Sequence, residues 1–424
     1  MAEPLAFRYG DESLQIPVEG AQWIRLLEEK PNTPINDLGA AFHQAVEADM
    51  IASRPLKELI APNEQVTLVV SDVTRAWMHQ DVVCELLVKY LHEEMSLPFE
   101  NLVILIAQGT HRPHTQAEMV KTVSAYVAER VRLVNHDAMA ADLAFVGNTS
   151  RGTPVKVNPL CVGRKVIMVG GTVHHLIAGY GGGRKSIVPG VAGWETIQKN
   201  HSYALHPVFS QAAEHVGLGI LEKNPVHLDM VEAAEMVAPV FGVNLVVNAQ
   251  GRHCALLCGH WLKAWEQSCK MVNDLFGLPI SEKADVVIAG CGGFPKDINL
   301  YQGVKSLLNA NEAVKDGGEI IFLCQCREGG GPPDFFDWIK PLKEGRLTEA
   351  LRANFTIAGY VFFAMCQVAR RCKVRMLTQL PPETTLAVGV EACQSLDELL
   401  RRVDFAGKTV YAMPFGGSIL PYLG

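Results

Sequence analysis

The sequence predicts an α/β protein of two domains, each a mainly parallel β-sheet flanked by helices, with the active site in the cleft between them. A chain of 424 residues is too long for one ordinary hydrophobic core. Short β-branched runs alternate with helical patterns, which is typical of parallel sheets covered on both faces. The runs end in glycine-rich or polar loops, and such sheets bind ligands outside the carboxyl ends of their strands. We expect an N-terminal cofactor-binding domain over 1–275 and a C-terminal Rossmann-like domain over 276–424.

Three strand–loop–helix units are expected in the first domain. They are QVTLVV (65–70) with the loop SDVTRAW and a helix over 81–94, LVILIA (102–107) with the loop QGTHRPHT and a helix over 116–129, and KVIMV (165–169) with a glycine-rich loop ending at Pro189. Because each loop follows the carboxyl end of a strand, we expect all three to face one cleft.

The second domain begins after a helix expected over 260–276. Its strand candidates are 285–289, 319–323, 374–377 and 409–412, with helical segments between them. We expect the last residues, 420–424, to pack against the domain.

Composition excludes several classes of function. The net charge of −7 and pI near 6.1 provide no general basic field for nucleic acid or an anionic membrane. No signal-peptide core stands at the N-terminus, and the longest apolar run, 357–366, is far shorter than the roughly 20 residues that span a bilayer. We therefore expect a cytoplasmic protein whose eleven cysteines are reduced, buried thiols.

The glycine-rich stretch GYGGGRKS carries the strongest chemical pattern. Gly182 and Gly183 let the backbone approach a ligand, and successive backbone N–H groups there suit an anion. It is not a P-loop, because Arg184 stands where that motif needs glycine. Lys185 is a candidate phosphate ligand or covalent tether. The alternative is a flexible loop with a solvated lysine.

Histidines gather around this lysine. His174, His175, His201 and His206 are four of the fourteen in the chain, all within residues 171–206. Lone histidines are more often structural, but this enrichment favours function for at least two. Imidazole is a ligand for nickel, copper, iron or zinc and the usual base near neutral pH.

The other two loops add a carboxylate, a guanidinium and more imidazoles. Asp72 and Arg75 are three apart, and arginine matches a substrate carboxylate in bidentate fashion. His111 and His114 follow a buried strand. The alternatives are a local Asp72–Arg75 salt bridge with Asp72 as helix cap, and a hydrogen-bonded turn for His111.

In the second domain, Tyr301, Gln302 and Lys305 fall on adjacent faces of one helix start after the strand 285–289. The positive end of that helix would favour an anionic substrate. A solvated helix face is the alternative.

Together these motifs resemble the lactate racemase family, whose members carry a nickel-pincer nucleotide. The likeness runs from about Asp72 to Lys305 and more loosely to the end. The matched motifs are Asp-x-Thr-Arg (Asp72, Thr74, Arg75), Gly-x-His-Arg (Gly109, His111, Arg112), a histidine ten residues before a lysine with another sixteen after it (His175, Lys185, His201), and Tyr-Gln-x-x-Lys (Tyr301, Gln302, Lys305). Four motifs in order at the right spacing are specific.

The resemblance implies a role for each matched residue. Lys185 would hold the pyridinium cofactor through a thioamide, with Asp72, Thr74, Gly182, Gly183 and Arg184 at the cofactor, and His201 would be the nickel ligand. His111 and His175 would be the acid–base pair, with His175 preferred over His174 on spacing alone. Arg75 would hold the substrate carboxylate, assisted by Tyr301, Gln302 and Lys305, while Asp72 would seat Arg75 or the nucleotide.

The implied reaction is racemisation or epimerisation of a small 2-hydroxy acid. Removing a hydride leaves a neutral ketone, whereas a carbanion beside a carboxylate is unfavourable, so an electrophilic cofactor suits the step. Opposite enantiomers present their hydroxyls on different sides, so two bases are expected.

Two departures from the family pattern bear on the substrate. Ala76 stands where proline is common, and 359–363 (GYVFF) lacks the tryptophan or basic residues of some relatives. Val361, Phe362 and Phe363 offer no second cation, which favours a monocarboxylate such as lactate over malate or a sugar acid. Lys296, Arg112 and Arg184 are alternative sources of that charge.

Two other functions compete with this interpretation. The glycine-rich loop could serve a nucleotide-binding phosphoryl-transfer enzyme, although no magnesium carboxylates stand near it. A non-catalytic carrier of the nickel cofactor is the second, and the pair His111 and His175 disfavours it. The expected partners are the substrate and the proteins that make the cofactor.

Overall fold

The computed structural model describes residues 4–424, which form two units. The N-terminal unit spans Pro31–Asp274. The C-terminal unit spans Leu275–Gly424 and includes the N-terminal segment up to Lys30. Among the described residues, no helix is both long and apolar enough to cross a membrane.

A six-stranded sheet forms the centre of the N-terminal unit. In spatial order its strands are β13 (His253–Gly259), β12 (Phe241–Val247), β9 (Lys165–Gly171), β4 (Val66–Ser71), β5 (Leu102–Ala107) and β6 (Arg132–Asn135). Only β12 and β13 pair antiparallel. The central strands are near-continuous runs of buried valine, leucine and isoleucine, as expected for a sheet covered on both faces.

Helices and two small hairpins surround this sheet. The helices are α1 (Leu38–Glu47), α2 (Leu56–Leu59), α3 (Gln80–Lys89), α4 (Gln116–Val123), α5 (Ala125–Ala128), α6 (Trp194–Ser202), α7 (Pro225–Val237) and α8 (Lys263–Phe276), with short turns η1 (Val73–Met78), η2 (Tyr90–Glu94), η3 (Phe99–Asn101), η4 (Pro159–Cys161) and η5 (Gly183–Ser186). The hairpins are β7 (Ala144–Asn148) with β8 (Pro154–Val157), and β10 (His174–His175) with β11 (Gly179–Tyr180). The helix expected over 116–129 is divided at Ser124, whose φ of 82° interrupts it.

Strand order places the predicted loops together. Chain order runs from β4 outward to β5 and β6, and then resumes on the other side of β4 with β9 and β12. The carboxyl ends of β4 and β9 therefore flank a topological switch point, where open α/β sheets bind ligands. The three loops predicted to face one cleft follow the adjacent strands β9, β4 and β5.

The C-terminal unit has a parallel sheet of its own. Its order is β18 (Val390–Cys393), β17 (Lys373–Leu377), β16 (Val314–Leu323), β15 (Ala284–Gly290), β19 (Thr409–Met413) and β3 (Trp23–Leu26). The helices are α9 (Leu300–Ala313), α10 (Ile339–Lys343), α11 (Leu347–Ala353), α12 (Ile357–Arg371), α13 (Pro382–Leu386) and α14 (Leu396–Arg402), with turns η6 (Phe335–Trp338) and η7 (Gly416–Ser418). The predicted final segment forms β20 (Leu420–Leu423), which pairs with β14 (Gly277–Ile280).

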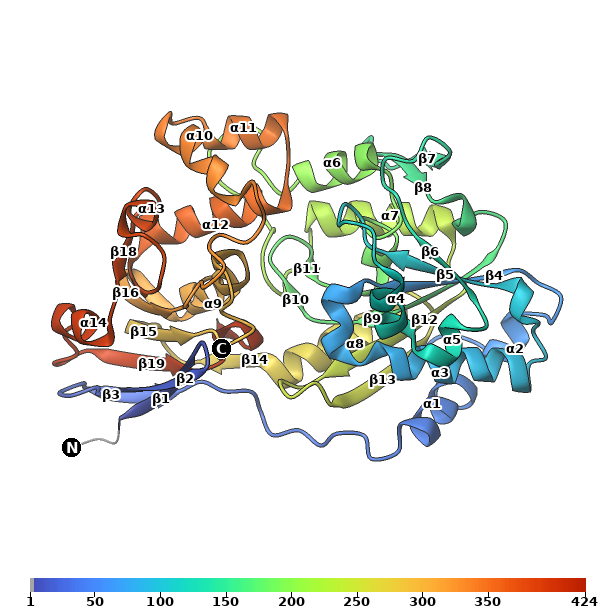
Figure 1. Cartoon of the computed structure of the whole chain (residues 1–424), viewed down its shortest axis with the longest axis horizontal. Helices are drawn as coiled ribbons and strands as arrows, with labels where there is room; N and C mark the ends of the chain where they lie inside the picture. Colours follow the sequence, from blue (N-terminus) through green and yellow to red (C-terminus); the bar gives the residue numbers. More distant parts are fainter. Residues whose placement is uncertain (1–3) are drawn as a thin grey trace. The chain divides into compact units, whose positions relative to one another are not determined.

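The N-terminal segment departs from the sequence-based domain division. It was assigned to the N-terminal domain, but β3 pairs in parallel with β19, almost 400 residues later. Figure 1 shows this blue strand beside the red one. The hairpin of β1 (Leu5–Tyr9) and β2 (Glu12–Ile16) contributes Phe7 and Ile16 to the core of the same unit. Long-range strand pairing of this kind leaves no local pattern in the sequence.

Candidate functional site

Asp72 directly follows β4 and pairs with His111 from the loop after β5. The Asp72 carboxylate is 5% exposed, and its Oδ2 lies 2.5 Å from His111 Nδ1. Burial raises the pKa of Asp72, but the hydrogen bond and charge of His111 together with the Thr74 hydroxyl bring it below its usual value. The bond holds the His111 proton on Nδ1, so the Nε2 lone pair of the exposed ring can accept a proton.

The link between Asp72 and Arg75 runs through Thr74. The Arg75 guanidinium donates hydrogen bonds to Thr74, with Nη1 3.1 Å from Oγ1. The Thr74 hydroxyl in turn donates to Asp72 Oδ1 at 2.5 Å. Thr74 therefore bridges the two charged side chains, and the charge of Arg75 also helps to lower the pKa of Asp72.

His114 supports this loop from inside. Its Nε2 accepts the backbone N–H of Val73 at 3.0 Å, and its Nδ1 lies 3.0 Å from Gln108 Oε1. The side chain is buried, so this imidazole is a structural link between the loops that carry Asp72 and His111.

His175 lies in the hairpin β10–β11, and its ring is held in the opposite tautomer to that of His111. The backbone N–H groups of Ile177 and Ala178 donate to Nδ1 at 3.1 and 3.2 Å. A neutral ring with Nδ1 as acceptor carries its proton on Nε2. Burial lowers the pKa of His175 well below its usual value, and the charges of Lys185 and Arg75 lower it further.

His174 points to the other side of the same two-residue strand. Its ring lies 5.1 Å from Tyr180, and burial lowers its pKa to about 4. Neighbouring residues of a strand face opposite sides, so only one of the two histidines can face Lys185. The charges that act on His175 identify it as that one.

The glycines of the loop are required by the fold itself. Gly182 and Gly183 have φ values of +69° and +53°. A Cβ on Gly183 would lie 2.4 Å from the ring of Trp265, and one on Gly182 would lie 2.7 Å from the carbonyl oxygen of Gly171. Neither position has room for a side chain, so η5 begins in a fixed place.

The predicted cofactor-binding role of the Arg184 side chain needs a correction. It is fully buried, and its guanidinium donates to the carbonyl oxygens of Ala178 at 2.6 Å and Tyr180 at 2.8 Å. Its Nε donates to His227 Nδ1 at 3.0 Å, and the group stacks on Trp265, 3.9 Å from the ring centroid. Arg184 thus clamps the loop rather than facing a ligand.

Lys185 follows this clamp and is partly exposed. Burial, followed by the charges of Arg184 and Arg75, lowers the pKa of its amine to about 7. An amine with this pKa is substantially neutral at physiological pH and can act as a nucleophile, which an ordinary lysine does poorly.

His201 lies in the last turn of α6 and is 1% exposed. Its Nδ1 lies 2.9 Å from the carbonyl oxygen of Ile197, so Nδ1 carries the proton and Nε2 carries the lone pair. Burial and the charge of Lys185 lower the pKa of His201 to about 3, which keeps the ring neutral as a metal ligand must be.

Four of the predicted residues therefore form one electrostatic group. Beyond the effect of burial, the charges of Lys185, Arg75 and His201 lower the pKa of His175, the charge of Arg75 lowers that of Lys185, and the charge of Lys185 lowers that of His201. In residues 4–424, no three or more His, Cys, Asp or Glu side chains are grouped so as to hold a metal. The arrangement suits an anionic ligand and a single imidazole donor.

Tyr301, Gln302 and Lys305 lie in the first turns of α9, as predicted. Asn299 caps this helix by accepting the backbone N–H of Gln302 at 3.0 Å. Lys305 Nζ donates to Gln302 Oε1 at 2.6 Å, and Tyr301 packs edge-on against Phe335. These residues follow β15, next to the point where the strand order of the second sheet reverses towards β19.

The sequence interpretation missed three residues on α7 and one on α8. All four are buried: Asn224, His227 and Trp265 bond to the segment 177–184, and Asp229 bonds to Asn200 on α6. The available signal was the polar character of the face that α7 buries, in which His227 and Asp229 lie among Val226 and Met230.

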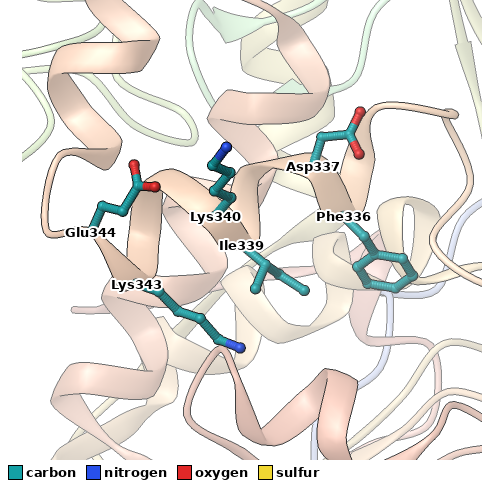
Figure 2. Close-up of a pocket in the computed structure, with 6 residues that line it drawn as sticks. All are labelled: Phe336, Asp337, Ile339, Lys340, Lys343 and Glu344. Atoms are coloured by element: carbon teal, nitrogen blue, oxygen red, sulfur yellow. The ribbon is translucent and has the colours of Figure 1, made fainter.

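A separate depression lies in the C-terminal unit, on η6 and α10. Figure 2 shows the residues that line it: Phe336, Asp337, Ile339, Lys340, Lys343 and Glu344. Two carboxylates and two ammonium groups give it no single sign of charge, and none of the candidate site residues lines it.

Fold and site together define an α/β enzyme with a cationic site at a sheet switch point. Residues 9–212 match the lactate racemase N-terminal domain, and residues 280–410 match the lactate racemase C-terminal domain. The lactate racemase of Thermoanaerobacterium thermosaccharolyticum is 31% identical over 298 residues, which are 69% of this chain and 67% of that protein. The lactate racemase of Lactiplantibacillus plantarum is 30% identical over 288 residues, 68% and 66% of the two chains.

Solved structures agree with these sequence matches. The lactate racemase apoprotein of T. thermosaccharolyticum superposes with a TM-score of 0.85 at 27% identity, covering 99% of this chain and 100% of that one. A Thermotoga maritima protein shares the fold with a TM-score of 0.64 at 20% identity, covering 85% and 94%. The chain belongs to the lactate racemase family, and it is an isomerase with racemase function.

Proposed function

We propose that this chain is a nickel-dependent racemase of small 2-hydroxy acids that works by reversible hydride transfer to a nickel-pincer nucleotide attached to Lys185. The observation that carries the proposal is the Lys185 amine, whose pKa is lowered to about 7 within a group of cations and imidazoles. Relatives named lactate racemase support the reaction class.

The chain's residues fit such a cofactor. A neutral amine can form the covalent link, and the cations around it favour an anionic nucleotide. His201 offers a neutral imidazole with Nε2 as donor, which suits nickel. When bound, the cofactor supplies a reversible acceptor for the hydride of the substrate carbon.

Arg75 is the residue that binds the substrate carboxylate. Its guanidinium is partly exposed and hydrogen-bonded to Thr74, and a planar guanidinium matches a carboxylate in bidentate fashion. Tyr301, Gln302 and Lys305 are further substrate-binding residues in this proposal, because they begin a helix whose positive end favours an anion.

The two histidines divide the acid–base work. His111 presents a lone pair on Nε2, because Asp72 holds its proton on Nδ1. His175 presents a proton on Nε2, because backbone N–H groups occupy Nδ1. At rest one ring is thus set to remove the hydroxyl proton and the other to donate a hydrogen bond to the substrate oxygen. Such base assistance contributes roughly 10²–10⁴-fold in rate.

The substrate we favour is a monocarboxylate, lactate first. Val361, Phe362 and Phe363 lie buried in α12, so this segment supplies no second cation for a dicarboxylate. Our proposal includes a cytoplasmic location and proteins that make and load the cofactor as partners.

The test uses protein from a host that makes the cofactor. Intact mass and nickel analysis should find an adduct on Lys185 with one nickel per adduct, and Lys185→Ala should lose adduct and activity together. Lactate, longer 2-hydroxy acids, malate and gluconate are then assayed in deuterated water. Hydride transfer keeps the carbon-bound hydrogen, so extensive deuterium at that carbon would exclude it. A more than tenfold preference for malate would exclude the monocarboxylate proposal.

A further inference from the structure

Helix α7 carries none of the residues assigned above, yet its N-terminal half bonds to three segments of the site. Asn224 caps this helix, His227 lies in its first turn, and Asp229 lies five residues after the cap. All three side chains are at most 9% exposed. Each of them bonds a different segment: the turn after His175, the clamp before Lys185, or the helix that bears His201.

Asn224 bonds both its own helix and the turn that orients His175. Its Oδ1 accepts the N–H groups of Val226 and His227 at 3.0 and 3.1 Å. Its Nδ2 donates to the carbonyl oxygen of Ile177 at 2.9 Å. The N–H of that same Ile177 donates to His175 Nδ1, so the cap and the catalytic imidazole share one residue of the turn.

His227 completes the clamp on the glycine-rich loop. Its Nδ1 accepts from Arg184 Nε at 3.0 Å, and its ring lies 5.6 Å from that of Trp265. The Trp265 Nε1 donates to the carbonyl oxygen of Gly181 at 2.8 Å. Without the His227 acceptor, a buried guanidinium would lose a partner, and loss of a buried charged group's hydrogen bond is strongly unfavourable. The loop backbone before Lys185 would then move to satisfy it.

Asp229 bonds α6 next to the proposed metal ligand. Its Oδ2 accepts from Asn200 Nδ2 at 2.8 Å, and Asn200 directly precedes His201. Its Oδ1 accepts from the Thr149 hydroxyl at 2.5 Å. The carboxylate is fully buried and accepts hydrogen bonds from the Thr149 and Thr153 hydroxyls and the Asn200 amide. Those bonds stabilise its charge and fix the position of α6.

We propose that the N-terminal half of α7 is a positioning platform in which Asn224, His227 and Asp229 set the placement of His175, Lys185 and His201 relative to one another. This inference rests on the proposed roles of Lys185 and His201. Asn224, His227 and Asp229 bond to Ile177, Arg184 and Asn200, which hold or directly precede the reacting residues. Direct outer partners of a metal ligand change metal affinity or activity by roughly 10–100-fold when removed, which is the upper range expected here.

The first test removes the His227 acceptor. His227→Leu lacks it, His227→Asn retains an oxygen near the position of Nδ1, and Glu235→Gln is a control on the exposed face of α7. Hydrogen exchange of the apoprotein should rise about tenfold in residues 171–190 for His227→Leu only, with residues 102–107 unchanged as an internal reference. In the loaded protein, His227→Leu should lower adduct occupancy on Lys185 while the nickel-to-adduct ratio stays constant.

The second test separates the α6 branch from the loop branch. Asp229→Asn should leave adduct occupancy unchanged, because the Arg184 clamp is intact. Loss of nickel to a chelator should become roughly 10–100-fold faster. Exchange should rise in residues 194–202 and stay unchanged in 171–190, and Glu235→Gln should match wild type throughout.

Wild-type exchange in both segments of both variants would overturn the platform. An equal rise in the hydrogen exchange of residues 102–107 would also overturn it, because it indicates general destabilisation. So would failure of His227→Asn to restore protection of residues 171–190, because the acceptor would then not be what holds the loop. A wild-type protein that carries no adduct would contradict the proposed function instead, and the exchange comparison of the apoprotein would still decide for or against the platform.

Discussion

At the scale of single residues, the site depends on which nitrogen of each imidazole carries the proton. Asp72 sets this for His111, backbone N–H groups set it for His175, and a helix carbonyl sets it for His201. The hydrogen-bond partner of each histidine ring decides whether that ring acts as a base, a hydrogen-bond donor or a metal ligand.

Replacing the Asp72 carboxylate tests the tautomer directly. In Asp72→Asn the amide can donate to His111 and stabilise the other tautomer, which places the lone pair away from the substrate. We expect kcat to fall roughly 10²–10⁴-fold with little change in KM or in nickel content. Steady-state kinetics and metal analysis measure both, with the exposed Asp142→Asn as control. An Asp72→Asn enzyme with wild-type kcat would remove Asp72 from the catalytic arrangement.

The lowered pKa of Lys185 predicts selective chemistry in the apoprotein. Acylation of its amine by a small ester reagent should rise with pH to a half-maximum near 7, where an ordinary lysine remains protonated. Peptide mass analysis across pH 5–9 measures it, and the exposed Lys156 serves as internal control. Parallel pH profiles for the two lysines would contradict the electrostatic explanation.

At the scale of elements, the hairpin β10–β11 separates two adjacent histidines. Because they face opposite sides, His175→Gln should keep nickel and lose rate, whereas His174→Gln should retain most activity. His201→Ala should instead lose nickel while the fold survives. Activity and metal content of the three variants test these roles. An inactive His174 variant beside an active His175 variant would make His174 the catalytic histidine instead.

The elements also show what the sequence could predict. The strands before Asp72, His111 and Lys185 were predictable because continuous β-branched runs end in polar loops, and parallel pairing then brings the loops together. The pairing of Trp23–Leu26 with β19 could not be predicted, because it depends on contacts between segments far apart in the chain. The α7 residues resembled an ordinary capped helix, since their function lies in partners on other elements.

At the scale of the whole molecule, the site places neutral imidazoles in the interior of the N-terminal unit, with consequences for acid stability. Burial lowers the pKa of His201 and His227 to about 3 from a usual 6.5. The unfolded chain binds these protons as pH falls below about 6.5, and the folded chain does not. The stability that these two neutral histidines contribute is therefore fully present above about pH 6.5, and it is lost as the pH falls towards their pKa values in the folded chain.

At pH 5.0, above the range where most carboxylates titrate, each of these two histidines should reduce the free energy of unfolding by on the order of 2 kcal/mol relative to pH 7.5. Urea unfolding of the apoprotein at the two pH values measures this. His227→Asn and His201→Asn cannot take up the proton, so each should lose less stability on acidification than wild type by about that amount. Equal pH dependence in wild type and both variants would mean that other groups govern acid unfolding and that these imidazoles are not held neutral by the fold.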